Sequence, residues 1–258
     1  MITARDIEQK LYAWAPKELA MEWDNVGLLI DGAPCDIKRI LVALDVTPGV
    51  AAEAIERGAD LIVSHHPVMN CAWHEVQTLR EDDAQGSLLR TLVKNDISVI
   101  SMHTNLDAAD GGVNDILAQT LGLEQITALN DEKIGRIGTL SCELPLEQFL
   151  QNVVKSLGCH GVRYISGSGT VKKVAVGGGA CREYIPQAIA QGCDTFVTSD
   201  LRYNDFLDTH GLNLIDAGHF PTENVICREI ASYLRTAYPA VETVLSTSHC
   251  EEVIQYFK

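Results

Sequence analysis

The sequence predicts an α/β protein in which helices cover mostly parallel sheets. Apolar stretches of strand length alternate with stretches whose apolar residues recur at helical spacing. Parallel strands need crossover connections, and the intervening helical stretches supply them. Several apolar stretches also stop at clusters of polar residues, which is typical of sheets whose ligands gather at the carboxyl ends of the strands.

The first half of the chain shows the clearest alternation. A helix is expected from Ile7 to about Leu19, with an interruption near Pro16, and then a loop that leads into a short strand. An early proline favours a helix start at Pro48, and Gly58 favours its end. The further elements expected are a strand over 39–47, a helix over 48–57, a strand over 60–64, a helix over 83–95, a strand over 97–102 and a helix over 113–121.

Residues 122–135 lose this pattern and are the best candidate for a boundary between domains. A second alternating series follows them, which is why we expect a second α/β region. Its expected strands cover 136–142, 162–166, 173–176, 195–198, 212–216 and 241–245, and its expected helices cover 146–157, 183–191, 203–209 and a long stretch that ends at about Tyr238.

Composition and charge exclude several classes of function. With 20 basic and 35 acidic residues, the formal net charge of −15 argues against sequence-independent binding to nucleic acid or to an anionic membrane. No apolar stretch reaches the roughly 20 residues that would span a bilayer, and the N-terminus lacks the features of a signal peptide. We therefore expect a cytoplasmic protein. The eight cysteines form no C-x-x-C pair, which favours reduced, mostly buried thiols.

Polar clusters follow three of the expected strands. Neighbouring residues on a regular strand point to opposite faces, so His65 and His66 can converge only if the backbone bends where their strand ends. Pro67 supports such an ending, because it has no backbone N–H for a central ladder. The three clusters supply His65 with His66, then His103 with Asp107, and then His219 with Glu223.

These residue types favour a metal site. Nitrogen and oxygen ligands without thiolate suit zinc, iron, manganese, cobalt or nickel, and their number fits two ions bridged by a carboxylate better than one tetrahedral ion. His219 and Glu223 are four residues apart, so they can reach one centre if a helix begins at Pro221. Alternatives remain for single residues: Asp107 could cap the next helix, and Glu223 could favour a helix N-terminus. The remaining histidines are expected to be hydrogen-bonding loop residues, namely His74, His160, His210 and His249.

Three glycines, Gly177, Gly178 and Gly179, lie between a strand and a helix. Backbone N–H groups in that setting can bind phosphate, but the dinucleotide and P-loop patterns are incomplete here, so a tight turn is favoured. Asp200 either lines the same cleft or caps the following helix. No G-x-S-x-G nucleophile motif occurs.

Five motifs together resemble the YbgI-like dinuclear-metal proteins, a family commonly labelled GTP cyclohydrolase I type 2 homologue. They are collinear with that family over nearly the whole chain. They are Trp23-Asp24-Asn25-Val26-Gly27-Leu28, Ser64-His65-His66-Pro67, His103-Thr104-Asn105-Leu106-Asp107, Gly177-Gly178-Gly179 and Gly218-His219-Phe220-Pro221-Thr222-Glu223.

The resemblance implies a set of roles for these residues. His66 and Asp107 would hold one metal ion, His65 and His219 the other, and Glu223 would bridge both, with His103 close by. It also implies two α/β domains, the first formed by 1–125 with 210–258 and the second by 126–209. A ring-shaped homohexamer is implied too. The segment Val68-Met69-Asn70-Cys71-Ala72-Trp73-His74 departs from the family pattern, because many relatives carry an apolar-aromatic and basic stretch after His66-Pro67.

Two functional hypotheses follow. The first is a metal-dependent hydrolase that opens the imidazole ring of GTP or of a related cyclic amidine or nucleotide and releases formate, with His103 as the proton shuttle and Glu223 as the bridging ligand. The second is a non-catalytic hexameric metal-binding scaffold or a metal-handling protein. The GTP substrate rests on the family label.

Overall fold

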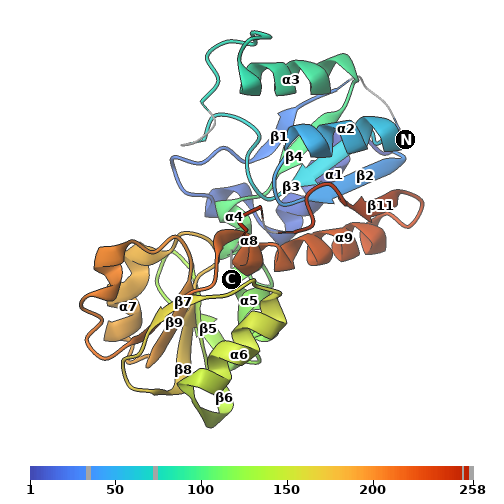
Figure 1. The fold of residues 1–258 in the computed structure, drawn as a ribbon. Coiled ribbons are helices and arrows are strands. Elements are labelled where there is room, and N and C mark those ends of the chain that lie inside the picture. The colour runs from blue at the N-terminus through green and yellow to red at the C-terminus, as the bar shows by residue number, and fades with distance from the viewer. Residues whose placement is uncertain (33–35, 72–74, 252, 256–258) are drawn as a thin grey trace. The chain divides into compact units, whose positions relative to one another are not determined.

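The computed structural model describes residues 1–32, 36–71, 75–251 and 253–255, and these form two compact units, each with one sheet (Figure 1). Unit 1 comprises Met1–Ala109 and Ile226–Glu251, and unit 2 comprises Asp110–Val225 with residues 253–255. The predicted α/β class is therefore confirmed. Among the described residues, no helix is both long and apolar enough to span a bilayer.

The sheet of unit 1 is mostly parallel, with the strand order β1-β4-β3-β2-β11. Its edge strand β1 runs antiparallel to β4, whereas the other three pairings are parallel. The carboxyl ends of β2, β3 and β4 therefore share one edge of the sheet. The strands are β1 (Gly27–Ile30), β2 (Arg39–Ala43), β3 (Leu61–Ser64), β4 (Ser98–Ser101) and β11 (Glu242–Leu245).

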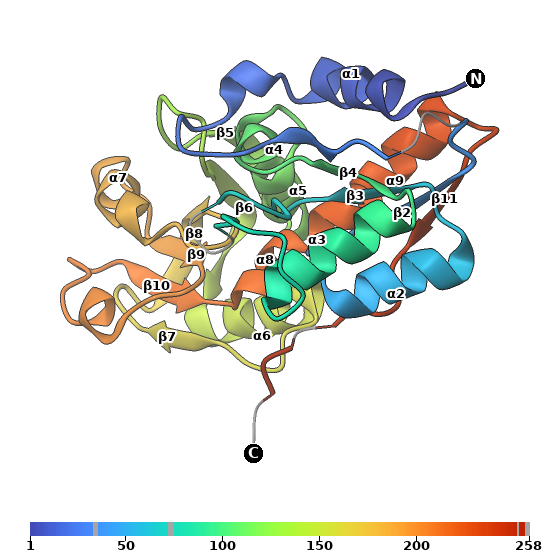
Figure 2. The same ribbon diagram turned by 90° about the horizontal axis from the view of Figure 1, so that it is seen from above.

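Helices cover both faces of this sheet, with α1 on one side and α2 and α3 on the other (Figure 2). Aliphatic side chains such as Val50, Ile62 and Leu89 fill the core beneath α2 and α3. On the opposite side, the rings of Trp14 and Tyr233 lie 4.9 Å apart and join α1 to α9. The helices are α1 (Ala4–Trp14), η1 (Lys17–Leu19), α2 (Pro48–Arg57), α3 (Ala84–Lys94), α4 (Thr104–Ala108) and α9 (Val225–Ala237).

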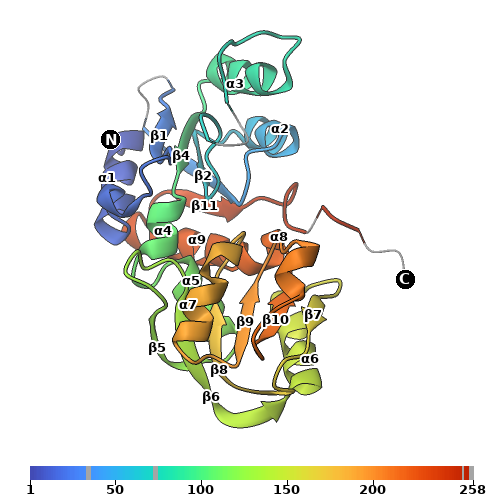
Figure 3. The ribbon, with the colours of Figure 1, turned by 90° about the vertical axis from the view of Figure 1, so that its left-hand side faces the viewer.

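The sheet of unit 2 is mixed, with the order β5-β6-β8-β9-β10-β7. Only its centre is parallel, where β9 lies between β8 and β10, as Figure 3 shows. The pairings β5 with β6, β6 with β8 and β10 with β7 are antiparallel, which differs from the mostly parallel prediction. The strands are β5 (Glu124–Ala128), β6 (Arg136–Pro145), β7 (Arg163–Ile165), β8 (Thr170–Val176), β9 (Thr195–Thr198) and β10 (Asn213–Asp216).

Helices α5 and α6 pack on one face of this sheet, and α7 lies on the other (Figure 1). Phe149 of α6 is fully buried in the same core cluster as Val174 and Val197. The helices are α5 (Val113–Thr120), α6 (Leu146–Leu157), η2 (Arg182–Tyr184), α7 (Ile185–Ala190), η3 (Tyr203–Phe206) and α8 (His219–Glu223).

The units divide between residues 109 and 110 and between 225 and 226, whereas the sequence placed the breaks at 125/126 and 209/210. The reason is strand pairing: β5 and β10 both belong to the second sheet. Residues 122–135 contain β5 and its connection to β6. Most described cysteines are buried, in agreement with the expectation, and Cys142 and Cys250 are exposed.

Candidate metal centre

His65 and His66 follow the last residue of β3. Their backbone N–H groups continue the pairing with the neighbouring chain, donating to the carbonyl oxygens of Ala43 at 3.3 Å and Leu44 at 2.9 Å. Both side chains are buried, and their ring centroids lie 5.1 Å apart at an angle of 40°. The end of the strand thus brings two consecutive imidazoles together, as the sequence predicts.

His103 and Asp107 join this pair. His103 follows β4 and immediately precedes α4, and its ring centroid lies 5.3 Å from that of His65 and 5.6 Å from that of His66. Ligand atoms of the three histidines all lie within 4.8 Å of one another. Asp107 Oδ1 is 3.7 Å from His65 Nε2. We call His65, His66, His103 and Asp107 the unit 1 donor set.

The imidazoles of the unit 1 donor set share one hydrogen-bonding pattern: each presents Nδ1 to an oxygen acceptor. The pairs are His65 with Met102 O at 2.7 Å, His66 with Asp45 Oδ1 at 2.6 Å, and His103 with Asp24 Oδ1 at 2.8 Å. An Nδ1–H that donates to oxygen leaves the lone pair on Nε2, the nitrogen that can bind a metal. This is the usual support of metal-ligating histidines in proteins.

Asp24 explains part of the Trp23-Asp24-Asn25 motif. Its side chain is fully buried, and it accepts hydrogen bonds from His103 and from both the backbone N–H and the hydroxyl of Thr104. Burial raises the pKa of Asp24, but these hydrogen bonds outweigh burial and lower the pKa to about 2. Asp24 is therefore a charged support beneath His103. Asn25 Nδ2 donates to Met69 O at 2.8 Å and so holds this motif to the segment that follows Pro67.

Asp45 holds two imidazoles at once. One carboxylate oxygen accepts from His66 Nδ1, and the other accepts from His249 Nε2 at 2.7 Å. Burial raises the pKa of Asp45, but the hydrogen bonds from His249 and His66 outweigh it, so the pKa lies below its usual range. His249, expected only as a hydrogen-bonding loop residue, is buried at this contact.

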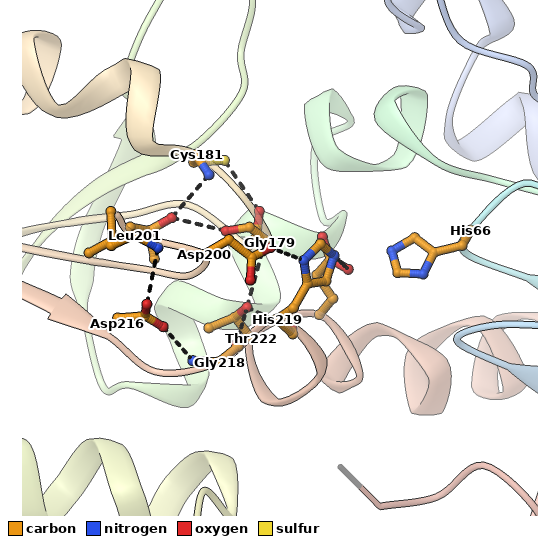
Figure 4. Close-up of polar contacts among 12 residues, drawn as sticks. His66, Gly179, Cys181, Asp200, Leu201, Asp216, Gly218, His219 and Thr222 are labelled. Carbon is orange, nitrogen blue, oxygen red and sulfur yellow. Dashed lines mark hydrogen bonds and ion pairs between the residues drawn. The ribbon is translucent and has the colours of Figure 1, made fainter. Parts of the chain in front are cut away.

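In unit 2, His219 and Glu223 lie one turn apart on α8, and we call them the unit 2 donor set. The helix begins at His219, two residues before the predicted start at Pro221, after Gly218 with a φ of +86°. His219 Nε2 is 3.0 Å from Glu223 Oε2. His219 Nδ1 donates to Asp200 Oδ2 at 2.6 Å. Figure 4 shows these two side chains facing each other. Asp200 thus supports His219 as Asp24 supports His103.

The position of His219 between two carboxylates governs its charge. Burial lowers the pKa of His219, but the attraction of Glu223 and the hydrogen bond to Asp200 outweigh burial and raise the pKa to about 11. A metal ion at Nε2 would replace a proton there, because both need the same lone pair.

The triple glycine packs against Glu223. The N–H groups of Gly177, Gly178 and Gly179 donate to Val197 O, Asn114 Oδ1 and Thr222 Oγ1, respectively. These donors already have protein acceptors, so the structure favours a packing role over phosphate binding. A Cβ added to Gly179, whose φ is +64°, would lie 2.0 Å from Glu223 Oε1. Only glycine lets the backbone approach this carboxylate so closely.

A cavity of about 510 Å³ opens in unit 1 beside Trp23. Its described lining residues are Trp23, Asn70, Cys71, Glu75, Val76 and Gln77. The Trp23 side chain is 57% exposed, and its ring meets that of His103 edge to face at a centroid distance of 6.1 Å. The volume suits a small organic ligand. Trp73 and His74, which the sequence places in this loop, lie outside the described residues.

The donors present fit divalent metal ions. Each set combines imidazole with carboxylate, and oxygen acceptors behind the imidazoles fix which nitrogen faces the ligand. The six side chains that the sequence singles out all lie in these two sets, but the sequence assigned no role to two supports, Asp24 and Asp45. Asp45 lies in the polar end of the strand expected over 39–47, two residues beyond the end of β2, so its place near a strand end was the available signal.

Relatives with similar sequences carry one name. A protein of Clostridium perfringens named "GTP cyclohydrolase 1 type 2 homolog" is 34% identical over 218 residues, covering 81% of this chain and 82% of that protein. A protein of the same name from Streptococcus pneumoniae is 33% identical over 242 residues, covering 90% and 89%. The resemblance stated from the motifs is thereby confirmed.

Solved structures show the same fold. The Staphylococcus aureus hypothetical protein SA1388 matches with a TM-score of 0.90 and 29% identity over 99% of both chains. Reduced HcgD from Methanocaldococcus jannaschii matches with a TM-score of 0.80 and 29% identity over 94% of this chain and 97% of that one. The protein ybgI, at 22% identity and a TM-score of 0.85, supports the fold. The model of one family, Duf34/NIF3 (NGG1p interacting factor 3), matches residues 2–251. The chain therefore belongs to the Duf34/NIF3 family.

Proposed function

We propose that the protein is a dinuclear metal-dependent hydrolase whose centre combines the unit 1 and unit 2 donor sets. In the assignment that the family resemblance implies, His66 and Asp107 would hold one divalent cation, His65 and His219 would hold the other, and Glu223 would serve both. One observation carries this proposal: four imidazoles, from two separate units, each present Nδ1 to an oxygen acceptor. That arrangement directs Nε2 toward a metal ion. Family membership supports joining the two sets.

Two bound divalent cations lower the pKa of a shared water toward neutrality and polarise the bond that is attacked. The chain contributes orientation and proton transfer. His103, backed by the charged Asp24, moves a proton at Nε2 between the attacking water and the leaving group. The carboxylate behind the ring stabilises the imidazolium that forms when His103 takes the proton.

The substrate class in this proposal is a cyclic amidine within a nucleotide, with GTP as the first candidate. One water adds to C8 and opens the imidazole ring of GTP to a formamide, and a second water hydrolyses the formamide, which releases formate and leaves an amine. Two features support this class: the relatives named "GTP cyclohydrolase 1 type 2 homolog", and a ligand-sized cavity lined by Trp23, whose exposed indole could stack on a planar ring. We also propose that the protein forms a ring-shaped homohexamer and that it lies in the cytoplasm. Sedimentation of the purified protein tests the hexamer.

The metal centre is tested first, on protein purified without chelators or a histidine tag. Elemental analysis should give a ratio near two metals per chain after loading with zinc, iron, manganese, cobalt or nickel. Glu223→Gln should lower that ratio, whereas Glu229→Gln, an exposed position on α9, should leave it unchanged. A ratio near zero at saturating metal overturns the centre.

Turnover is tested separately with GTP. Formate release should appear with at least one metal and should be lost in Glu223→Gln. Two bound metals without formate from GTP would overturn the GTP assignment. If related cyclic amidines and phosphoesters also stay intact, the result favours a metal-binding scaffold.

A further inference from the structure

A hydrogen-bonded relay runs from the C-terminal segment of unit 1 to the donor His66. His249 Nε2 meets Asp45 Oδ2 at 2.7 Å, and Asp45 Oδ1 meets His66 Nδ1 at 2.6 Å. His66 and His249 are both buried. Each carboxylate oxygen therefore has one imidazole N–H to accept, which fixes the rotation of the carboxylate as well as its charge.

A second carboxylate holds the segment that carries His249. Glu53, on α2, is 5% exposed and accepts from Ser246 Oγ at 2.6 Å, Thr247 Oγ1 at 2.9 Å, and the backbone N–H groups of Thr247 and Ser248. Burial raises the pKa of Glu53, but these hydrogen bonds outweigh burial and lower the pKa to about 2. The three residues before His249 are thus tied to α2 by a charged group.

From this geometry we infer that His249 is a positioning residue for the metal centre. Through Asp45 it fixes the ring orientation and the Nδ1–H tautomer of His66, and Glu53 holds His249 in place. This inference rests on the proposed function, because His66 must bind a metal for its orientation to matter. It assigns a role to a histidine that no sequence motif marks, 204 residues away from Asp45.

Metal affinity tests this role. In His249→Ala, the affinity for the metal that His66 holds should fall about 10- to 100-fold, the usual cost of losing an outer partner of a metal ligand. His249→Gln should restore the affinity to within about threefold, because a glutamine amide can still donate to Asp45 from a similar position. His210→Ala is the matched control: that histidine is exposed and pairs with Asp208 on the surface of unit 2. Its affinities should equal those of the unchanged protein.

Nitrogen NMR of the metal-free protein gives a readout that needs neither metal nor turnover. Signals of His66, assigned by their loss in His66→Gln, should show the Nδ1–H tautomer in the neutral ring of the unchanged protein. They should show a mixture of tautomers in His249→Ala. An Nε2–H tautomer in the unchanged protein overturns the inference even if His249→Ala does not fold.

Glu53→Gln tests the attachment of the segment, with the exposed Glu56→Gln on the same helix as its control. Metal affinity should fall in the first variant and stay constant in the second. If the unchanged protein binds no metal, the proposed function fails. If it binds two metals and His249→Ala binds them equally well, only the role of His249 fails.

Discussion

The two units build their donor sets in different ways. In unit 1, histidines stand at strand ends, and charged or backbone oxygens behind them fix their rings. In unit 2, both donors lie on a five-residue helix, and a glycine backbone packs directly against Glu223. Both units thus place a carboxylate behind an imidazole, but unit 2 depends in addition on the absence of a side chain at Gly179.

Gly179→Ala should lower the free energy of unfolding more than the other substitutions, because it removes the close packing of the glycine backbone against Glu223. The added Cβ would lie 2.0 Å from Glu223 Oε1 at a φ of +64°, so Glu223 must leave its place beside His219 or the backbone must shift. We expect the free energy of unfolding to fall by about 3 kcal/mol, from strain and lost packing together. Urea unfolding measures this loss, and elemental analysis should show less bound metal.

Gly192→Ala separates backbone strain from close packing. Gly192 has a similar φ of +69°, but nothing lies within 4 Å of an added Cβ. This variant should lose only about 1 kcal/mol, the cost of the left-handed conformation for alanine. Equal losses in both alanine variants would show that the contact with Glu223 is unimportant.

Asp24→Asn should cause the next largest loss in the free energy of unfolding. It tests the hydrogen bonds that support His103 in unit 1. An amide cannot accept all three hydrogen bonds that His103 and Thr104 donate to the buried carboxylate. We expect the free energy of unfolding to fall by about 2 kcal/mol at pH 7. Asp31→Asn removes an exposed pair with Arg5 and should change it by less than about 0.5 kcal/mol. Similar values for both variants would contradict a supporting role for Asp24.

Glu53→Gln should act on stability through pH. The pKa of Glu53 is lowered from 4.5 to about 2 in the folded protein. Its charged contacts therefore stabilise the protein above pH 4.5, and that stabilisation is lost as pH falls toward 2. The variant should be about 1–2 kcal/mol less stable at pH 7, and the difference should shrink toward zero near pH 2. Urea unfolding at a series of pH values measures the difference, and a constant gap would contradict this assignment.

Trp23→Ala should change stability least, by less than about 0.5 kcal/mol, because the indole is 57% exposed. Its effect should appear in substrate binding instead. If GTP is the substrate, KM should rise several-fold, because stacking of a base on an aromatic ring is worth about 1–3 kcal/mol. Trp23→Phe should retain most of the affinity. A KM that stays constant in Trp23→Ala would place the base elsewhere.

Local signals predicted most of the fold. The helices Pro48–Arg57 and Leu146–Leu157 agree with the sequence expectation residue for residue, because each has an apolar stripe and ends at a glycine with positive φ. The sequence did not predict strand β5. This edge strand has mostly exposed side chains, so its residues show no alternation of apolar and polar types. With β5 unseen, its antiparallel pairing with β6 could not be foreseen.

In the candidate site, too, the sequence predicted some residues and not others. Its donors lie in compact motifs at strand ends, so their types and spacing could be recognised. The supports come from distant parts of the chain: Asp24 is 79 residues from His103, and His249 is 204 residues from Asp45. No periodicity links such pairs, because their contact arises only when the strands assemble. Gly179 carried a signal, but a triple glycine fits a tight turn as well as close packing.

The pairing of β11 with β2 has a consequence for the order of folding. Glu242 lies beside Arg39, although 203 residues separate them, whereas unit 2 is formed almost entirely from the continuous stretch Asp110–Val225. During synthesis, unit 2 can therefore collapse while the parallel sheet of unit 1 still lacks its last strand. Closing such a long loop is slow, so the incomplete edge at β2 is the part of the nascent chain most exposed to wrong strand pairing.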